Sequence, residues 1–301
     1  MIKKAIIPVA GLGTRMLPIT QSIPKEMLPL GRKPVLHRVV DELATAGVDQ
    51  VLFITASHKN AIKDYFDRKP QNSNKVISSQ QDPRAIIGDG SPLPSLEYSF
   101  IQQDTPSGNG DAVRLGRSFV GEEDFVVAWG DTVIQSSIDQ NVMRRMIEVH
   151  LEEKSACTIA VQPVCSDKVS NYGIVRPLYE SDWGFPIDKI VEKPSVKKAP
   201  SKFAVSARYI CDSSIFPALE ATSRGRMGEL WLADAIQGLI RAGRSVWCVP
   251  LGIDSLRYDI GTPLTYWEAF TNYAIQDEYD GPAFSKFLKR LVAAREDTRS
   301  D

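Results

Sequence analysis

Residues 4–13 read KAIIPVAGLG, a compact apolar run that ends in a loop with Gly11 and Gly13. Such a run is typical of a strand buried on both faces of a parallel sheet. Apolar residues then recur at helical spacing and predict a helix over 34–46, and VLFIT at 51–55 predicts a second buried strand. A strand, a helix and a strand in this order form a βαβ unit, whose strands run parallel.

The alternation of helices and strands continues through the first half of the chain. The expected order is a helix at 57–66, a strand at 97–102, a helix from about 108, a strand at 124–129 and a helix at 138–154. Residues 68–96 are rich in Pro, Ser, Asn, Gln and Gly, which favours a long, mobile surface loop. We therefore expect an α/β protein with a Rossmann-like, mostly parallel sheet flanked by helices.

The second half of the chain has a different character. Strand-like runs follow one another at 157–163, 173–176, 187–192 and 203–210. No helix of useful length separates the middle two, which indicates an added mixed or antiparallel layer. An amphipathic helix at 230–243, a strand at 245–251 and two closing helices complete the expected order.

The composition is that of an ordinary globular protein, with 43% apolar and 24% charged residues among 301. Thirty-six basic and 37 acidic residues give a net charge of -1, so no overall field would hold nucleic acid or an anionic membrane. Any anion must therefore be bound by a local site.

The N-terminal run and the cysteines favour a cytoplasmic location. The run at 5–10 is interrupted by Pro8 and is too short for a signal peptide or a membrane span. The cysteines lie far apart without metal-ligand spacing, and we expect reduced thiols in the core. They are Cys157, Cys165, Cys211 and Cys248.

The glycine loop is the first candidate site. Gly11 and Gly13 would let backbone N–H groups approach a polyphosphate, and Arg15 and Lys25 would add two cations. The glycine pair alone is equally typical of an ordinary turn. GLGTRM lacks the third glycine of a dinucleotide fingerprint, and no GK[ST] follows as in a Walker loop.

The wider stretch is far more specific. AGLGTR at 10–15, PKEMLPL at 24–30 and KP at 33–34 together resemble the signature of the sugar nucleotidyltransferases, most closely the bacterial UTP:glucose-1-phosphate uridylyltransferases. Further matches in the same order extend over about residues 3–275. They are Gln103 with GNGDAV at 108–113, GDT at 130–132, YGIV at 172–175, VEKP at 191–194, GELWLADAI at 228–236 and YDIG at 258–261.

This resemblance implies the nucleotide-diphospho-sugar transferase fold and a magnesium-dependent reaction of UTP with glucose 1-phosphate, giving UDP-glucose and pyrophosphate. It implies one domain over 1–279, with a nucleotide-binding part at about 1–135 and a sugar-binding part at about 136–279. A C-terminal helix and tail would occupy 280–301. We expect a homodimer or homotetramer. Use of dTTP or another hexose 1-phosphate stays open, and so does a non-catalytic sugar-nucleotide-binding homologue.

The resemblance also assigns site residues. Catalysis would rest on Arg15 and Lys25 at the triphosphate and Lys193 at the sugar phosphate. The nucleotide would be bound by Ala10, Gly11, Leu12, Gly13, Thr14, Gln103, Gly108 and Asp131. The sugar would be bound by Tyr172, Gly173, Glu192, Lys193 and Glu229. Magnesium would be held by Asp131 and Asp259, since Mg²⁺ prefers hard oxygen ligands and uses one or two carboxylates together with substrate phosphates.

Each of these residue types also has an ordinary structural explanation. Lone aspartates at strand ends are common turn or cap residues, and Glu229 in a first helical turn would be favoured by the helix dipole alone. Strand alternation sends either Gln102 or Gln103 into the site, and the spacing to Gly108 favours Gln103.

Two segments depart from the close uridylyltransferase pattern. The usual GLGHA is GNGDA here, so that Asn109 replaces a leucine and Asp111 a histidine beside the expected nucleotide. WGDT at 129–132 resembles the GD form of thymidylyltransferases. These departures leave the choice of base and sugar open.

Overall fold

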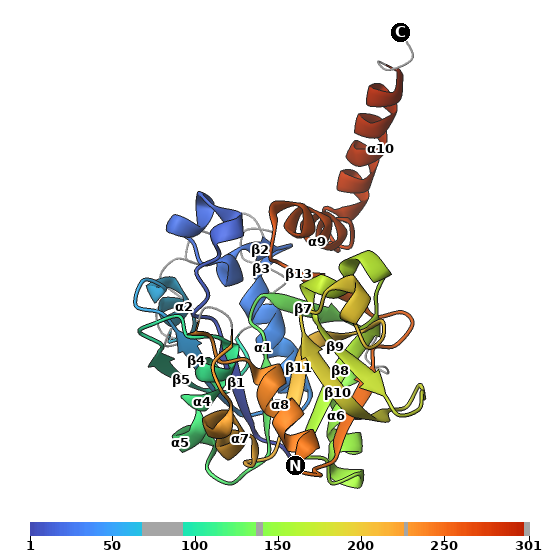
Figure 1. Cartoon of the computed structure of the whole chain (residues 1–301). Coiled ribbons are helices and arrows are strands. Elements are labelled where there is room, and N and C mark those ends of the chain that lie inside the picture. Colours follow the sequence, from blue (N-terminus) through green and yellow to red (C-terminus); the bar gives the residue numbers. More distant parts are fainter. Residues whose placement is uncertain (68–92, 137–140, 226–227, 298–301) are drawn as a thin grey trace.

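A nine-stranded mixed sheet forms the centre of the molecule (Figure 1). The computed structural model describes residues 1–67, 93–136, 141–225 and 228–297. The strand order is β5-β4-β1-β6-β11-β8-β12-β10-β9. In chain order these strands are β1 (Lys4–Pro8), β4 (Gln50–Thr55), β5 (Glu97–Gln102), β6 (Phe125–Ala128), β8 (Cys157–Pro163), β9 (Gly173–Pro177), β10 (Phe185–Glu192), β11 (Phe203–Cys211) and β12 (Val246–Pro250).

Helices cover both faces of this sheet, because the side chains of its buried strands alternate between two cores. Ala5 and Ile7 of β1 belong to one core, whereas Ile6 between them belongs to the other. The first core receives α1 (Val35–Thr45), α2 (Asn60–Phe66) and α6 (Val142–Glu152). The second receives α4 (Asn109–Arg114), α5 (Arg117–Val120), α7 (Ile215–Ala221) and α8 (Leu232–Arg241).

The first four strands of the sheet are parallel, as the βαβ pattern predicts. The added strands are mixed and mainly antiparallel, which confirms the expected α/β class. They continue the same sheet, however, and do not form a separate layer. Because β9 also pairs with β11, the last five strands close on themselves.

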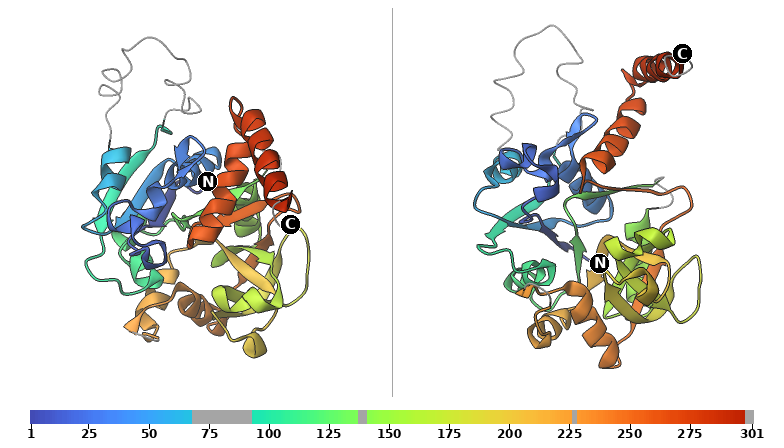
Figure 2. Two further views of the ribbon diagram at one scale, coloured as in Figure 1. Left: turned by 90° about the horizontal axis from the view of Figure 1, so that it is seen from above. Right: turned by 45° about the horizontal axis from the view of Figure 1, so that its top comes forward.

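Two small two-stranded sheets lie apart from the central sheet, and two helices end the chain. β7 (Thr132–Gln135) pairs with β13 (Leu256–Asp259), and β2 (Pro29–Leu30) pairs with β3 (Lys33–Pro34). The chain closes with α9 (Pro263–Ile275) and α10 (Gly281–Asp297). α10 projects from the body, and Figure 2 shows its C-terminal end clear of the other elements.

Several sequence expectations can be judged against these elements. The loop expected at 68–96 and the start of the helix expected at 138–154 fall largely on residues outside those described. The expectation of core thiols is wrong for Cys165, which is exposed because it follows β8, whereas the other three cysteines are buried and unpaired. Within the described residues, no helix has the length and apolar character needed to cross a bilayer.

Candidate active site

The candidate site lies at the carboxyl edge of the parallel strands. β1 has β4 on one side and β6 on the other, so the strand order changes direction at β1. Ligands of open α/β sheets bind in the crevice that such a change creates. The glycine loop at 10–14 follows β1, and Asp131 follows β6. These two expected site segments therefore lie together at the point where the strand order changes direction.

The glycine loop offers unpaired donors. The N–H groups of Ala10, Gly11, Leu12 and Gly13 donate to no acceptor among the described residues. The loop then turns into a short 3-10 helix, Thr14–Met16, after Gly13 in the left-handed conformation with φ 66°. Unpaired N–H groups of this kind suit a polyphosphate.

Lys25 contacts Asp131 directly. It stands in a 3-10 helix, Lys25–Met27, and its Nζ donates a hydrogen bond to Oδ2 of Asp131. Burial would lower the pKa of Lys25, but the carboxylates of Asp131 and Glu26 outweigh it and raise that pKa above its ordinary value. Burial likewise raises the pKa of Asp131, and the Lys25 ammonium more than reverses this effect.

The pairing of β7 with β13 brings Asp259 to Asp131. Asp259 lies opposite Thr132 in that ladder, and the N–H of Ile260 donates to the carbonyl oxygen of Asp131 at 2.8 Å. Burial and the Asp131 carboxylate both raise the pKa of Asp259, because two negative charges are held close together.

Arg15 completes this group of charges. A Cβ atom placed on Gly261 would lie 2.8 Å from Oδ1 of Asp259 and 2.9 Å from Nη2 of Arg15. The guanidinium and the carboxylate thus converge on the bare backbone of Gly261. Two cations and two carboxylates from distant parts of the chain therefore meet beside the glycine loop.

The donor set fits a divalent cation that also takes ligands from a substrate. Asp131 and Asp259 supply two carboxylates, and the pKa of Asp259 is raised first by burial and then by the Asp131 charge. No cluster of three or more His, Cys, Asp or Glu side chains with metal-binding geometry occurs in the part of the chain that the structure describes. Mg²⁺ needs only one or two carboxylates when phosphates and waters complete its shell.

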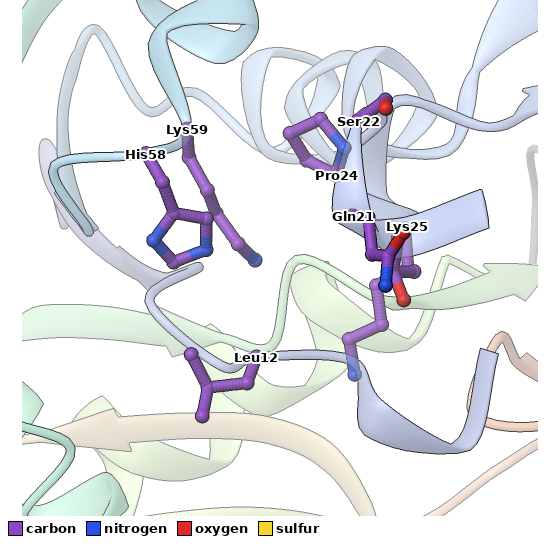
Figure 3. A pocket seen from close by; sticks show the side chains of 8 residues that line it. Leu12, Gln21, Ser22, Pro24, Lys25, His58 and Lys59 are labelled. Atoms are coloured by element: carbon purple, nitrogen blue, oxygen red, sulfur yellow. The ribbon is translucent and has the colours of Figure 1, made fainter. Parts of the chain in front are cut away.

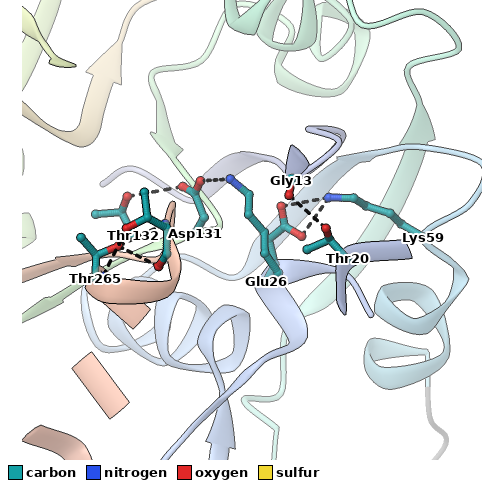
Figure 4. A network of polar contacts seen from close by, with 9 residues as sticks. Gly13, Thr20, Glu26, Lys59, Asp131, Thr132 and Thr265 are labelled. Carbon is teal, nitrogen blue, oxygen red and sulfur yellow. Dashed lines mark hydrogen bonds and ion pairs between the residues drawn. The ribbon is translucent and has the colours of Figure 1, made fainter. Parts of the chain in front are cut away.

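Glu26, which follows Lys25 in the chain, forms a buried ion pair with Lys59 that the sequence did not reveal (Figure 4). Lys59 Nζ donates to Oε1 and Oε2 of Glu26 at 3.0 and 2.9 Å, and the two residues are 4% and 2% exposed. Burial raises the pKa of Glu26 and lowers that of Lys59. Figure 3 shows Lys25, His58 and Lys59 around a small hollow that Leu12 of the glycine loop also lines.

The expected sugar residues also come together. Gly173 lies opposite Glu192 in the β9–β10 ladder, and the N–H of Lys193 donates to the carbonyl oxygen of Tyr172 at 3.0 Å. Lys193 Nζ is 3.8 Å from Oε1 of Glu192. Burial raises the pKa of Glu192 despite this ammonium, with Asp234 and Glu229 contributing further.

Trp231, which the sequence did not single out, lies beside Lys193 of the sugar group. Lys193 Nζ stands 4.7 Å from the Trp231 ring centroid, a cation–π contact. Lys193 also has a φ of 42°, in the left-handed region that costs a non-glycine residue about 1–3 kcal/mol and occurs often at functional sites. The only sequence signal for Trp231 was its place in GELWLADAI beside Glu229.

Tyr172 from the sugar group and Asp259 from the charged group line one cavity of about 320 Å³. Arg257, also unpredicted, lies between them, with its guanidinium 4.4 Å from the Tyr172 ring centroid.

Gly108, to which Gln103 is hydrogen-bonded, packs against Leu230 in the segment 228–236. Gly108 has a φ of 100°, and a Cβ there would lie 2.4 Å from the carbonyl oxygen of Leu230, so only glycine fits. Gly110 N donates to Leu230 O at 2.8 Å, and Asn109 Oδ1 accepts from Leu232 N at 2.9 Å. The departure at Asn109 therefore serves to satisfy the first N–H of α8.

Comparison with known proteins agrees with this geometry. The family model described as nucleotidyl transferase matches residues 4–276. The chain is 36% identical to UTP–glucose-1-phosphate uridylyltransferase 2 of Staphylococcus saprophyticus, over 96% of this chain and 98% of the relative. It is 34% identical to UTP–glucose-1-phosphate uridylyltransferase of Staphylococcus haemolyticus, with the same coverage.

Solved structures give the same result. UTP-bound UGPase from Acinetobacter baumannii superposes with a TM-score of 0.85 at 33% identity, over 97% of this chain and 100% of that one. A UDP-glucose pyrophosphorylase complexed with UDP-glucose gives a TM-score of 0.80 at 31% identity, over 92% and 100%. Because the family model matches residues 4–276 and these proteins share the fold over nearly the whole chain, the chain belongs to the nucleotidyl transferase family.

Proposed function

We propose that this chain transfers the uridylyl group of UTP to glucose 1-phosphate, forming UDP-glucose and releasing pyrophosphate in a magnesium-dependent reaction. The observation that carries the proposal is the convergence of Lys25, Arg15, Asp131 and Asp259 beside a loop with unpaired N–H groups. The names of the relatives and the UTP-bound neighbour support the choice of substrates.

The chemistry requires one anion to approach another. The sugar phosphate oxygen attacks the α-phosphorus in line, and pyrophosphate leaves on the opposite side. The protein contributes positioning and charge neutralisation more than covalent work. In our proposal the N–H groups of residues 10–14 and the side chains of Arg15 and Lys25 bind the triphosphate, while Lys193 binds the incoming sugar phosphate.

Asp131 and Asp259 would hold Mg²⁺. The bound ion would supply a positive charge to the phosphate oxygens and help to fix their orientation. Because Lys25 donates to Oδ2 of Asp131, the ammonium keeps that carboxylate ionised and ready to accept a cation.

The sugar contacts follow from the second group of residues. Glu192 would accept hydrogen bonds from glucose hydroxyls, and Glu229 would face the same hexose. Tyr172 and Gly173 would line the pocket with their backbone. We also propose a nucleotide-binding part at about 1–135 and a sugar-binding part at about 136–279, with Asp259 returning to the first part through β13.

We further propose that subunits associate as a homodimer or homotetramer, because apolar side chains of α10 are exposed. They include Phe287, Leu291 and Val292. The four unpaired cysteines fit a reducing compartment, and we propose the cytoplasm as the site of the reaction.

The direct test is pyrophosphate release over a panel of four nucleotides and several sugar phosphates, with and without a magnesium chelator. We expect the highest kcat/KM with UTP and glucose 1-phosphate, and no turnover after chelation. A preference for dTTP or another hexose would keep the reaction and change the substrates. Binding without turnover for every pair would refute the proposal.

A further inference from the structure

A hydrogen bond inside the protein determines what Gln103 can offer a ligand. Its Nε2 donates to Oδ2 of Asp111 at 2.8 Å and lies 3.4 Å from the carbonyl oxygen of Gly108. Gln103 is 8% exposed and Asp111 is 6% exposed. Since an ionised carboxylate only accepts hydrogen bonds, the Gln103 atom that faces Asp111 has to be the amide nitrogen.

The position of Asp111 is itself fixed. The preceding residues are bonded to the segment before α8, through Gly110 N to Leu230 O and Leu230 N to Ser107 O, both at 2.8 Å. Arg114 Nη2 lies 2.9 Å from Oδ1 of Asp111, and Arg224 Nη2 lies 3.7 Å from the same atom. Asp111 is therefore anchored on several sides, and it imposes an orientation on the Gln103 amide.

In this orientation the side-chain oxygen is the one polar atom of the Gln103 side chain that remains available to a ligand. Both protons of Nε2 are directed at acceptors within the protein, while Oε1 accepts no hydrogen bond from the described residues. Such a side chain can only accept from a ligand. It matches the N3–H of uracil or thymine, whereas cytosine presents a bare acceptor nitrogen at the same position.

We infer that Asp111 is a positioning residue that sets base selectivity, because it holds the Gln103 amide in the orientation that accepts from an N3–H group. The inference rests on the proposed function, in which Gln103 faces the pyrimidine. Gln103 lies at the same sheet edge as the glycine loop, since β5 pairs with β4 and β4 with β1. The Asp111 carboxylate thus accepts a hydrogen bond from Gln103 and lies beside two arginine guanidinium groups.

The test compares kcat/KM for UTP, dTTP and CTP in the wild type and in the variants Asp111→Asn and Asp111→Glu. An asparagine can donate as well as accept, so the side-chain amide of Gln103 can rotate to present its nitrogen to the base. We therefore expect the preference for UTP over CTP to fall about tenfold or more. The ratio of UTP to dTTP stays unchanged, because both bases carry N3–H. Asp111→Glu keeps a carboxylate and retains the preference.

A merely structural role for Asp111 predicts the opposite order. The isosteric asparagine would then be milder than the bulkier glutamate, and all three nucleotides would lose activity equally. Asp104→Asn, an exposed neighbour, is the matched control. If Asp111→Asn does not fold by circular dichroism, Asp111→Ser replaces it, since a hydroxyl also donates and accepts.

The outcomes separate the two proposals. A wild type that turns over no nucleotide refutes both the proposed function and this inference. A wild type that turns over UTP but uses CTP equally well, or an Asp111→Asn variant whose preference for UTP over CTP changes less than twofold, refutes the inference alone.

Discussion

Lys25 donates a hydrogen bond to Oδ2 of Asp131, so a cation proposed for the triphosphate and a carboxylate proposed for the metal are already in contact. Glu26, the next residue, accepts two hydrogen bonds from Lys59. This arrangement places Lys25 between two carboxylates, and it makes the consequences of changing each partner specific.

Lys25→Ala should reduce kcat by orders of magnitude and leave the fold intact, because it removes a charge from a partly buried phosphate site. Steady-state pyrophosphate release and a thermal melt together measure this. Lys63→Ala removes an exposed lysine of α2 and serves as the control. Unchanged activity in Lys25→Ala would remove this residue from the mechanism.

Asp131→Asn should raise the magnesium concentration needed for half-maximal activity at least tenfold, or abolish activity, since one of two carboxylate ligands is lost. Asp259→Asn should act in the same direction. A magnesium titration of each variant gives the answer, with exposed Asp254→Asn as the control. A metal response equal to that of the wild type would rule out the ligand role.

Lys193→Ala should lower kcat/KM for glucose 1-phosphate about 100-fold, because a charge-assisted hydrogen bond to the sugar phosphate is lost. KM for UTP should change little. Initial rates with each substrate varied in turn separate the two effects, and Lys197→Ala, an exposed nearby lysine, is the control. Equal changes in both KM values would contradict a contact with the sugar phosphate.

Lys59→Met should lower the free energy of unfolding by about 3–5 kcal/mol at neutral pH, because it removes the hydrogen-bonded counter-ion of the buried Glu26 carboxylate. Burial already holds the pKa of Glu26 above 4.5, and losing Lys59 raises it further. A carboxyl with a raised folded pKa destabilises the protein above that pKa, and the penalty disappears once the group is protonated. The deficit should therefore shrink as pH falls towards 4.5.

Urea denaturation of wild type and Lys59→Met at several pH values measures this deficit. Lys63→Met, exposed on the same helix, should show none. Adding Glu26→Gln to Lys59→Met should recover much of the loss at neutral pH. A deficit that does not vary with pH would mean that the lost packing, and not the uncompensated charge, causes it.

Phe287→Asp together with Leu291→Asp should convert the proposed oligomer into monomers, since charges on the exposed apolar face of α10 oppose burial against a second copy. Light scattering after size-exclusion chromatography measures the mass. Lys286→Asp, on the same helix, is the control. A monomeric wild type would refute the proposed association.

Local pattern was enough to predict most of the fold. The apolar run of β1 and the helical spacing of α1 specify their elements within a few residues, because buried strands and amphipathic helices differ in period. The short strands β7 and β13 were missed. β7 and β13 are four residues each, and neither has a pattern that distinguishes it from a loop.

The site was predicted unevenly for a related reason. Motifs such as AGLGTR and PKEMLPL indicated the residues that we propose for the triphosphate, because each motif is a short continuous segment. Lys59 and Arg257 were missed because each acts through a partner far away in the sequence, Glu26 and Tyr172. Neither residue belongs to a motif of its own.

Periodicity and short motifs in the sequence were sufficient for the parallel βαβ half of the sheet, for the glycine loop and for the residue types that we propose for phosphate, sugar and metal. Only the tertiary structure decided that Asp259 faces Asp131 through the β7–β13 pairing, and that Asp111 holds the Gln103 amide. Such contacts require two separately folded segments to meet at a defined register, and register is set by the packing of the whole sheet.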